Sequence, residues 1–85
     1  MDRQYAEAER LQRDILAIRQ RELGPEHTDF LLSKYNLSTV LRRSGQRAAA
    51  ERLLRETLDE QTRFLGTENA DALATNKILL RFSPT

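Results

Sequence analysis

The stretch RELGPEHTD, from Arg21 to Asp29, returns later in the chain as RFLGTENAD, from Arg63 to Asp71. Sliding the chain by the 42 residues that separate the two copies compares 43 residue pairs, and 15 of these pairs are identical. Chance would give about four identities in a chain so rich in Leu and Arg. A catalytic loop is needed once, whereas a joint between structural repeats is needed at every repeat. The recurrence therefore predicts a repeated helical scaffold.

The repeated stretch has the chemistry of a helix stop followed by a helix start. Gly24 and Gly66 follow the last apolar residue of a helical pattern, where a left-handed residue can end the helix. Pro25 then blocks continuation in the first copy. The residues expected to begin the next helix are His27 or Thr28 as cap with Asp29 in the first turn, and Asn69 as cap with Asp71 in the second copy.

Between these joints the apolar residues recur every three or four positions, as in Tyr5, Ala8, Leu11, Ile15 and Ile18, which indicates amphipathic helices. A shorter turn is expected at residues 44–46, and Pro84 is expected to end the last helix. The predicted helices span residues 2–23, 28–43, 46–65 and 70–82. Oppositely charged residues four apart, such as Glu51 with Arg55, Arg52 with Glu56 and Asp59 with Arg63, are typical of a solvated helix face.

Composition excludes several classes of function. A formal net charge of +1 leaves no global field that would attract nucleic acid or an anionic membrane, so neither is expected as a partner. The chain has no cysteine, which excludes disulfides, thiolate metal sites and cysteine nucleophiles. No segment approaches the roughly 18 apolar residues of a membrane span. We therefore expect a cytoplasmic protein that forms one small domain over residues 1–85.

Catalytic chemistry is weakly represented. The single histidine, His27, has no second histidine or cysteine with which to hold a metal, and helix capping is a sufficient role for it. The second copy of the loop has Asn69 at the equivalent place, which a catalytic histidine would not allow. No glycine-rich phosphate loop or Ser/His/Asp arrangement is present. The sequence predicts a non-enzymatic protein with no catalytic residue, cofactor or metal.

The segments LGPEHTD, NLSTVLRRSGQ and AAAERLLRETL together resemble tetratricopeptide repeats of the 42-residue type found in kinesin light chains. The resemblance covers essentially the whole chain. It implies an all-α fold of antiparallel helix-turn-helix repeats, with four helices in a short right-handed α-solenoid. Residues 2–23 would be the second helix of a half repeat, residues 28–65 one complete repeat, and residues 70–82 the first helix of a further half repeat.

The same resemblance implies a protein-protein interaction module that holds a peptide or partner protein in a concave groove lined by first helices. Several of the implied groove residues are basic, which suggests an acidic partner. The alternative is that arginines at the end of a helix complement its dipole and stay in water. The groove residues would be Leu32, Tyr35, Thr39, Arg42, Arg43, Lys77 and Arg81.

A second hypothesis is structural. Apolar residues near both ends of the chain lack the neighbours of an uninterrupted array and would be free to associate. The chain would then be a fragment of a longer array, or a homo-oligomer that forms a closed dimer or a filament. The residues expected to mediate self-association are Tyr5, Ile15, Ile18, Ile78, Leu79, Leu80 and Phe82.

Overall fold

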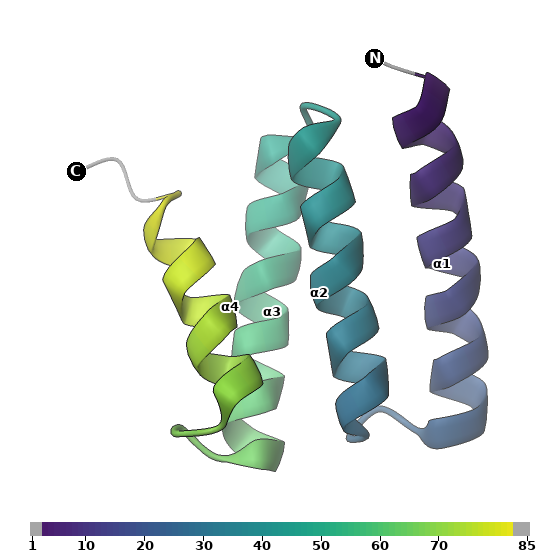
Figure 1. The fold of residues 1–85 in the computed structure, drawn as a ribbon. Coiled ribbons are helices and arrows are strands. Elements are labelled where there is room, and N and C mark those ends of the chain that lie inside the picture. Colours follow the sequence, from purple (N-terminus) through teal and green to yellow (C-terminus); the bar gives the residue numbers. More distant parts are fainter. Residues whose placement is uncertain (1–2, 83–85) are drawn as a thin grey trace.

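The computed structural model describes residues 3–82, which form four α-helices joined by short turns. The helices are α1 (Arg3–Leu23), α2 (Thr28–Arg43), α3 (Arg47–Leu65) and α4 (Ala70–Leu80). Successive helices run antiparallel, so that α2 and α4 point the same way (Figure 1). The molecule is a slab with extents of 39 × 36 × 16 Å. The predicted all-α fold with four helices is confirmed.

The joints act as the sequence predicts. His27 caps α2, and its Nδ1 accepts a hydrogen bond from the backbone N–H of Asp29 at 3.0 Å. Asn69 caps α4 in the same way, and its Oδ1 accepts from the backbone N–H of Asp71 at 2.8 Å. Each cap satisfies a donor that would otherwise be unpaired in the first turn of a helix. The histidine of the loop is thus a capping residue.

The helix boundaries differ slightly from those predicted. Helix α3 begins at Arg47, one residue after the predicted start at Gln46. Helix α4 ends at Leu80, two residues early, because the next two backbone N–H groups bond to carbonyls three residues back. Such bonds tighten the last turn of a helix. The predicted helix start at Asp2 and the predicted stop at Pro84 lie outside the described residues.

The core lies between α2, α3 and α4. Its central cluster combines leucines of α2 and α3 with Ala50, with Leu79 of α4 and with Phe82, which follows α4. Helix α1 contributes Leu16, which packs against this cluster while remaining partly exposed. No side chain of residues 4–23 is fully buried. The cluster consists of Leu37, Leu41, Ala50, Leu54, Leu79 and Phe82.

Two of the residues predicted to be open for association are instead part of this core. The side chains of Leu79 and Phe82 are only 8% and 7% exposed, and Ile78 packs partly buried against the same cluster. The guanidinium of Arg47 lies over the Phe82 ring at 4.5 Å from its centroid. The prediction that Leu79 and Phe82 lack neighbours is therefore wrong. The end of α4 contacts the beginning of α3, which helical periodicity alone does not reveal.

Residues 42 apart show how burial depends on the neighbouring helix. Leu37 in α2 and its counterpart Leu79 in α4 are both buried, because each packs on the core cluster that α3 shares. Leu31 in α2 is 0% exposed, whereas its counterpart Leu73 in α4 is 54% exposed. Helix α2 packs against helices on both of its sides, and α4 packs substantially only against α3. The repeated sequence therefore produces a covered face on α2 and an open face on α4.

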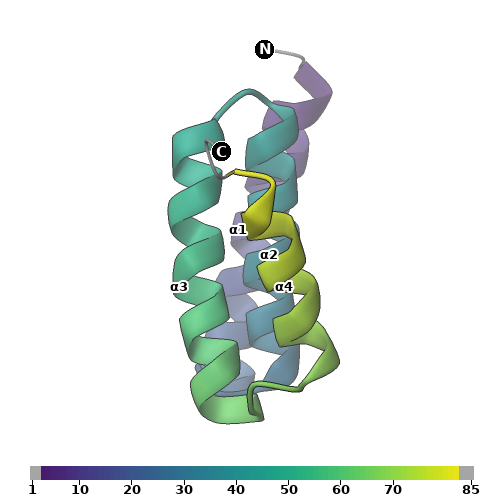
Figure 2. The same cartoon turned by 90° about the vertical axis from the view of Figure 1, so that its left-hand side faces the viewer.

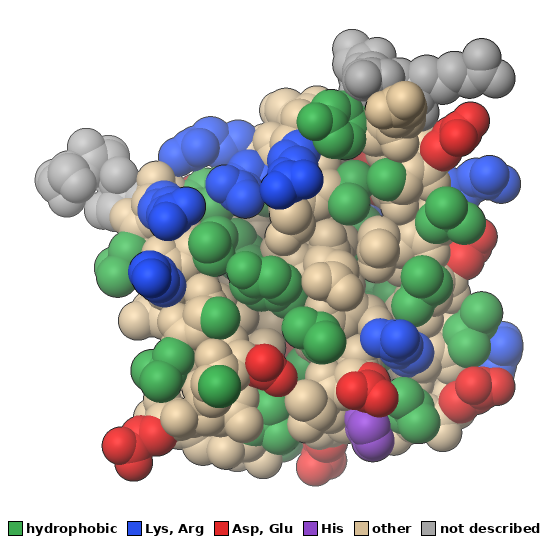
Figure 3. All heavy atoms as spheres, viewed as in Figure 1, with side chains coloured by type: hydrophobic (Ala, Val, Ile, Leu, Met, Phe, Trp, Pro, Cys, Tyr) green, Lys and Arg blue, Asp and Glu red, His purple; other side chains and the backbone are tan. Residues whose placement is uncertain are grey.

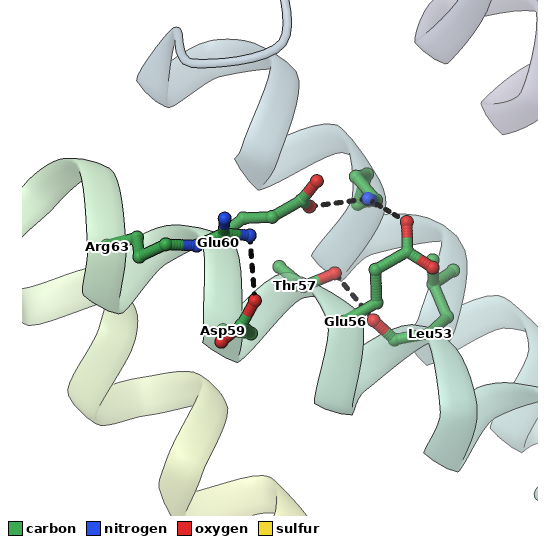
Figure 4. A network of polar contacts seen from close by, with 7 residues as sticks. Leu53, Glu56, Thr57, Asp59, Glu60 and Arg63 are labelled. Carbon is green, nitrogen blue, oxygen red and sulfur yellow. Dashed lines mark hydrogen bonds and ion pairs between the residues drawn. The ribbon is translucent and has the colours of Figure 1, made fainter.

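Some of the predicted surface ion pairs form. Arg55 donates to Glu51 at 2.8 Å on the exposed side of α3. Arg63 donates to Asp59 at 2.8 Å further along the same helix (Figure 4). Exposed pairs of this kind contribute about 0.3–0.5 kcal/mol each. They solubilise the outer face of the helix and do little to fix the fold.

Glu56 pairs with Lys34 of α2 instead of with Arg52, the partner that the sequence predicts. It accepts a hydrogen bond from Lys34 Nζ, and Glu60, one turn further along α3, accepts another from the same ammonium. Figure 4 shows both carboxylates reaching from α3 toward a common nitrogen on the neighbouring helix. The Lys34 side chain is only 6% exposed. This clamp joins α2 to α3 at a position where the sequence predicts a solvated charge.

Candidate partner-binding groove

Helices α2 and α4 lie beside each other on one side of the molecule, and α3 lies behind them on the other side (Figure 2). A small pocket of about 100 Å³ opens between them. Leu32 and Tyr35 of α2 form one wall, and Ala74 of α4 lies in the other. Leu32 is 37% exposed, while Tyr35 is partly buried and also packs on the core. These two predicted groove residues thus line a real hollow.

The predicted basic residues lie further along the same faces of α2 and α4. Thr39 and Arg42 follow Tyr35 by one and two helical turns, and Lys77 and Arg81 follow Ala74 likewise. Residues spaced by three, four or seven positions share one face of a helix. Figure 3 shows Lys and Arg side chains gathered over the upper ends of α2 and α4. We call Arg42, Arg43, Lys77 and Arg81 the basic cluster.

The basic cluster is not neutralised internally. Arg43, Lys77 and Arg81 are exposed and Arg42 is partly exposed. Within residues 3–82, none of these four side chains forms a hydrogen bond or an ion pair. Elsewhere, Arg55 and other cations are paired with carboxylates on their own helix. Four uncompensated cations on one face create a local positive potential that the net charge of +1 hides.

Thr39, the remaining predicted groove residue, is partly buried between the pocket and the basic cluster. Its hydroxyl donates to the backbone carbonyl of Tyr35 at 3.3 Å. The hydroxyl proton is thus engaged within α2, and only its oxygen is available to accept from a ligand. Thr39 contributes less polarity to the groove than the sequence suggests.

Sequence reasoning missed Gln61, which reaches the floor of the pocket from α3. Its side chain is 1% exposed, and neither Nε2 nor Oε1 has a hydrogen-bond partner. The residue 42 positions earlier is Arg19, which donates to Ser33 Oγ at 2.8 Å and to the Asp29 carbonyl at 3.2 Å. The repeat therefore places a polar side chain at this position twice. Only the side chain in the first copy, Arg19, has hydrogen-bond partners. Comparing the two copies could have identified Gln61 from the sequence.

A larger hollow of about 530 Å³ lies between α1 and α3, over α2. Leu16 and Leu53 line it together with Lys34. The lysine is already bonded to Glu56 and Glu60, which also line this hollow. Its buried charge is therefore satisfied within the fold, unlike the basic cluster and the Gln61 amide.

Other chemistry is absent from the described part of the chain. Across residues 3–82, no group of three or more histidine or acidic side chains is arranged to hold a metal ion. None of the four helices is both long enough and apolar enough to span a lipid bilayer.

The comparison with known proteins agrees with the geometry. The family model of the tetratricopeptide repeat matches residues 1–76. No curated protein and no solved structure is significantly similar to the chain. Tetratricopeptide repeats are generally protein-protein interaction modules and are typically non-catalytic. With helix-turn-helix joints in the right places and a family match over most of its length, this chain belongs to the tetratricopeptide repeat family, of the kinesin-light-chain-like type.

Proposed function

We propose that this protein is a non-enzymatic binding module that holds an extended acidic segment of a partner protein in the groove between α2 and α4. The observation that carries the proposal is the basic cluster, whose four cations lie on the face of the pocket and have no partner within residues 3–82. Carboxylates of the partner would supply the missing counter-charges through charge-assisted hydrogen bonds. Leu32 and Tyr35 would provide apolar contact beside them.

The helix dipole offers a competing explanation for part of the basic cluster. Arg42 and Arg43 lie in the last turn of α2, and Lys77 lies in the last turn of α4, where cations are favourable. That explanation accounts for each helix separately. It does not require the ends of both helices to carry cations on the face that bears the pocket. The two explanations differ in whether the cations affect binding or only stability.

The test is charge reversal at the end of α2. We expect the double variant Arg42→Glu with Arg43→Glu to bind a fluorescein-labelled, aspartate-rich peptide at least about 100-fold more weakly than wild type, because each lost charged hydrogen bond is worth about 1.5–3 kcal/mol. Fluorescence anisotropy would measure the affinity. Circular dichroism should show unchanged helicity, because both side chains are at least partly exposed.

A matched control is available on α1. Arg10 and Arg21 are exposed there, and reversing both to Glu changes the net charge by the same amount away from the groove. This control variant should lose less than about threefold in affinity, which is a general electrostatic effect that salt screens. Equal losses in the two double variants would show that the groove is not the binding site.

Self-association is a second candidate function, and one observation favours it. Leu73 and Leu80 on α4 are 54% and 67% exposed, and Leu11, Ile15 and Ile18 form an exposed row on α1. Exposed apolar rows of this kind are typical of faces that another helix covers. Tyr5 and Ile78 are only partly exposed, and Leu79 and Phe82 are buried, so these four contribute less than the sequence predicts. The covering helix would come from a second copy or from further repeats.

A further inference from the structure

We propose that the pocket between α2 and α4 takes a primary carboxamide side chain of the bound segment, that of an asparagine, and that Gln61 and Asp71 recognise it. This inference rests on the proposed function, because it concerns the same groove. It adds a specificity site to the electrostatic attraction of the basic cluster.

The Gln61 amide has unused hydrogen-bonding capacity. Its nitrogen and oxygen are buried without a hydrogen-bond partner, and the whole side chain is 1% exposed. A buried amide that is left unpaired opposes folding, and most buried polar groups in proteins are paired. Arg19, the counterpart of Gln61 in α1, is bonded to Ser33 and to the Asp29 carbonyl. The unpaired amide is therefore a property of this pocket and is not imposed by the repeat.

The pocket is small. Its volume of about 100 Å³ is less than a fifth of the 530 Å³ of the hollow between α1 and α3. A peptide backbone with its flanking residues cannot enter so small a space between two helices. One short side chain can. Because Gln61, Leu32 and Tyr35 all line the pocket, the tip of that side chain would lie beside the Gln61 side chain.

The polar groups that line the pocket restrict the chemistry of the tip of that side chain. Asp71 also lines the pocket, and its carboxylate forms no hydrogen bond within residues 3–82. An apolar tip would leave the Gln61 amide unpaired, and a carboxylate tip would be repelled by Asp71. An ammonium could pair with Asp71 but would offer no acceptor to Gln61 Nε2. A carboxamide can accept from Nε2 while its two N–H groups donate to Oε1 and to the Asp71 carboxylate.

The distance between the pocket and the basic cluster sets the spacing of residues within the bound segment. Arg42 lies seven residues beyond Tyr35, and Arg81 lies seven residues beyond Ala74. At 1.5 Å per residue of helix, the basic cluster is therefore about 10 Å along the groove from the pocket. An extended peptide covers this distance in about three residues. The preferred ligand thus carries an asparagine about three residues away from its acidic residues.

The experiment uses two labelled peptides and the full chain. Each peptide carries fluorescein at its N-terminus, three consecutive aspartates and a free C-terminal carboxylate, so that it has no other primary carboxamide. One peptide has an asparagine three positions from the aspartates, and the other has a leucine of similar shape there. The protein variants are wild type, Gln61→Met and, as a matched control, Gln20→Met on the exposed side of α1. Fluorescence anisotropy measures all affinities.

We expect wild type and Gln20→Met to bind the asparagine peptide at least about tenfold more tightly than the leucine peptide. Gln61→Met should lose this preference while still binding the leucine peptide, and Asp71→Asn should weaken the preference severalfold. If wild type binds both peptides equally, or if Gln61→Met keeps the preference, the carboxamide site is refuted and the proposed function stands. If wild type binds neither peptide, both proposals are refuted.

Discussion

At the scale of single residues, Gly66 shows why the joint between repeats contains glycine. Its backbone angles are φ 99° and ψ 155°, which is a region that residues with a Cβ avoid. The predicted positive φ is confirmed, but the ψ value differs from that of the common left-handed helix cap. A Cβ added at Gly66 would meet no atom within 4 Å. The requirement for glycine therefore comes from the backbone conformation alone.

Gly66→Ala should lower the free energy of unfolding by about 1–3 kcal/mol, because the alanine would be held in a disfavoured region of φ and ψ. Urea denaturation followed by circular dichroism would measure the loss. Thr67→Ala, an exposed neighbour in the same turn, is the control and should change stability by less than about 0.5 kcal/mol. A Gly66→Ala variant as stable as the control would mean that the turn can relax into another conformation.

At the scale of elements, the four helices differ in how firmly tertiary contacts hold them. Helices α2 and α3 share the core cluster and the Lys34 clamp with Glu56 and Glu60. Helix α1 is the longest, yet no side chain of residues 4–23 is fully buried. It is held to the rest of the fold by Leu16, by the hydrogen bonds of Arg19 to α2, and by Glu9, which accepts from Gln46 Nε2 at 2.9 Å. Because tertiary packing supplies most helical stability in proteins, α1 is the least secured of the long helices.

Amide hydrogen exchange should therefore show α1 opening at a free energy at least about 1 kcal/mol below that of the interior of α3. The comparison is well matched, since α1 has 21 residues and α3 has 19. Mass spectrometry of peptic fragments would resolve the two helices. Equal protection in both helices would show that the four helices open as one cooperative unit.

At the scale of the whole molecule, the thin stack leaves both charged and apolar side chains at its surface. The basic cluster lies on the face formed by α2 and α4, whereas the apolar rows lie on α1 and on the open side of α4. The slab is only 16 Å thick, so much of every helix remains near the surface. A thin repeat stack gains stability from each neighbour that covers an open face.

Sedimentation equilibrium should detect concentration-dependent association at tens of micromolar if the apolar row of α4 is an interface. Leu80→Ser, which copies the Ser38 found 42 residues earlier, should weaken this association without reducing helicity, because Leu80 is 67% exposed. Leu23→Ser, a 42% exposed leucine at the end of α1 and outside both rows, serves as the control. A folded chain that stays monomeric at high concentration would exclude the second candidate function.

Much of the architecture follows from the sequence because its signals are local. A glycine stop, a capping His27 or Asn69 and a helical apolar period each act over a few residues, so they can be recognised without knowing the fold. The family resemblance extended these signals to the groove face, and Leu32 and Tyr35 do line a pocket there. The role of the predicted groove residues in binding stays a prediction.

The sequence by itself determined that the chain forms four helices, their approximate bounds, and that the unit repeats after 42 residues. Only the tertiary structure decided which equivalent positions are covered. It buried Leu31 and exposed Leu73, buried Lys34 in a carboxylate clamp, and left the Gln61 amide unpaired beneath the groove. The physical reason is that capping and periodicity depend on neighbours along the chain, whereas burial and hydrogen bonding depend on which helix packs against a face and how closely.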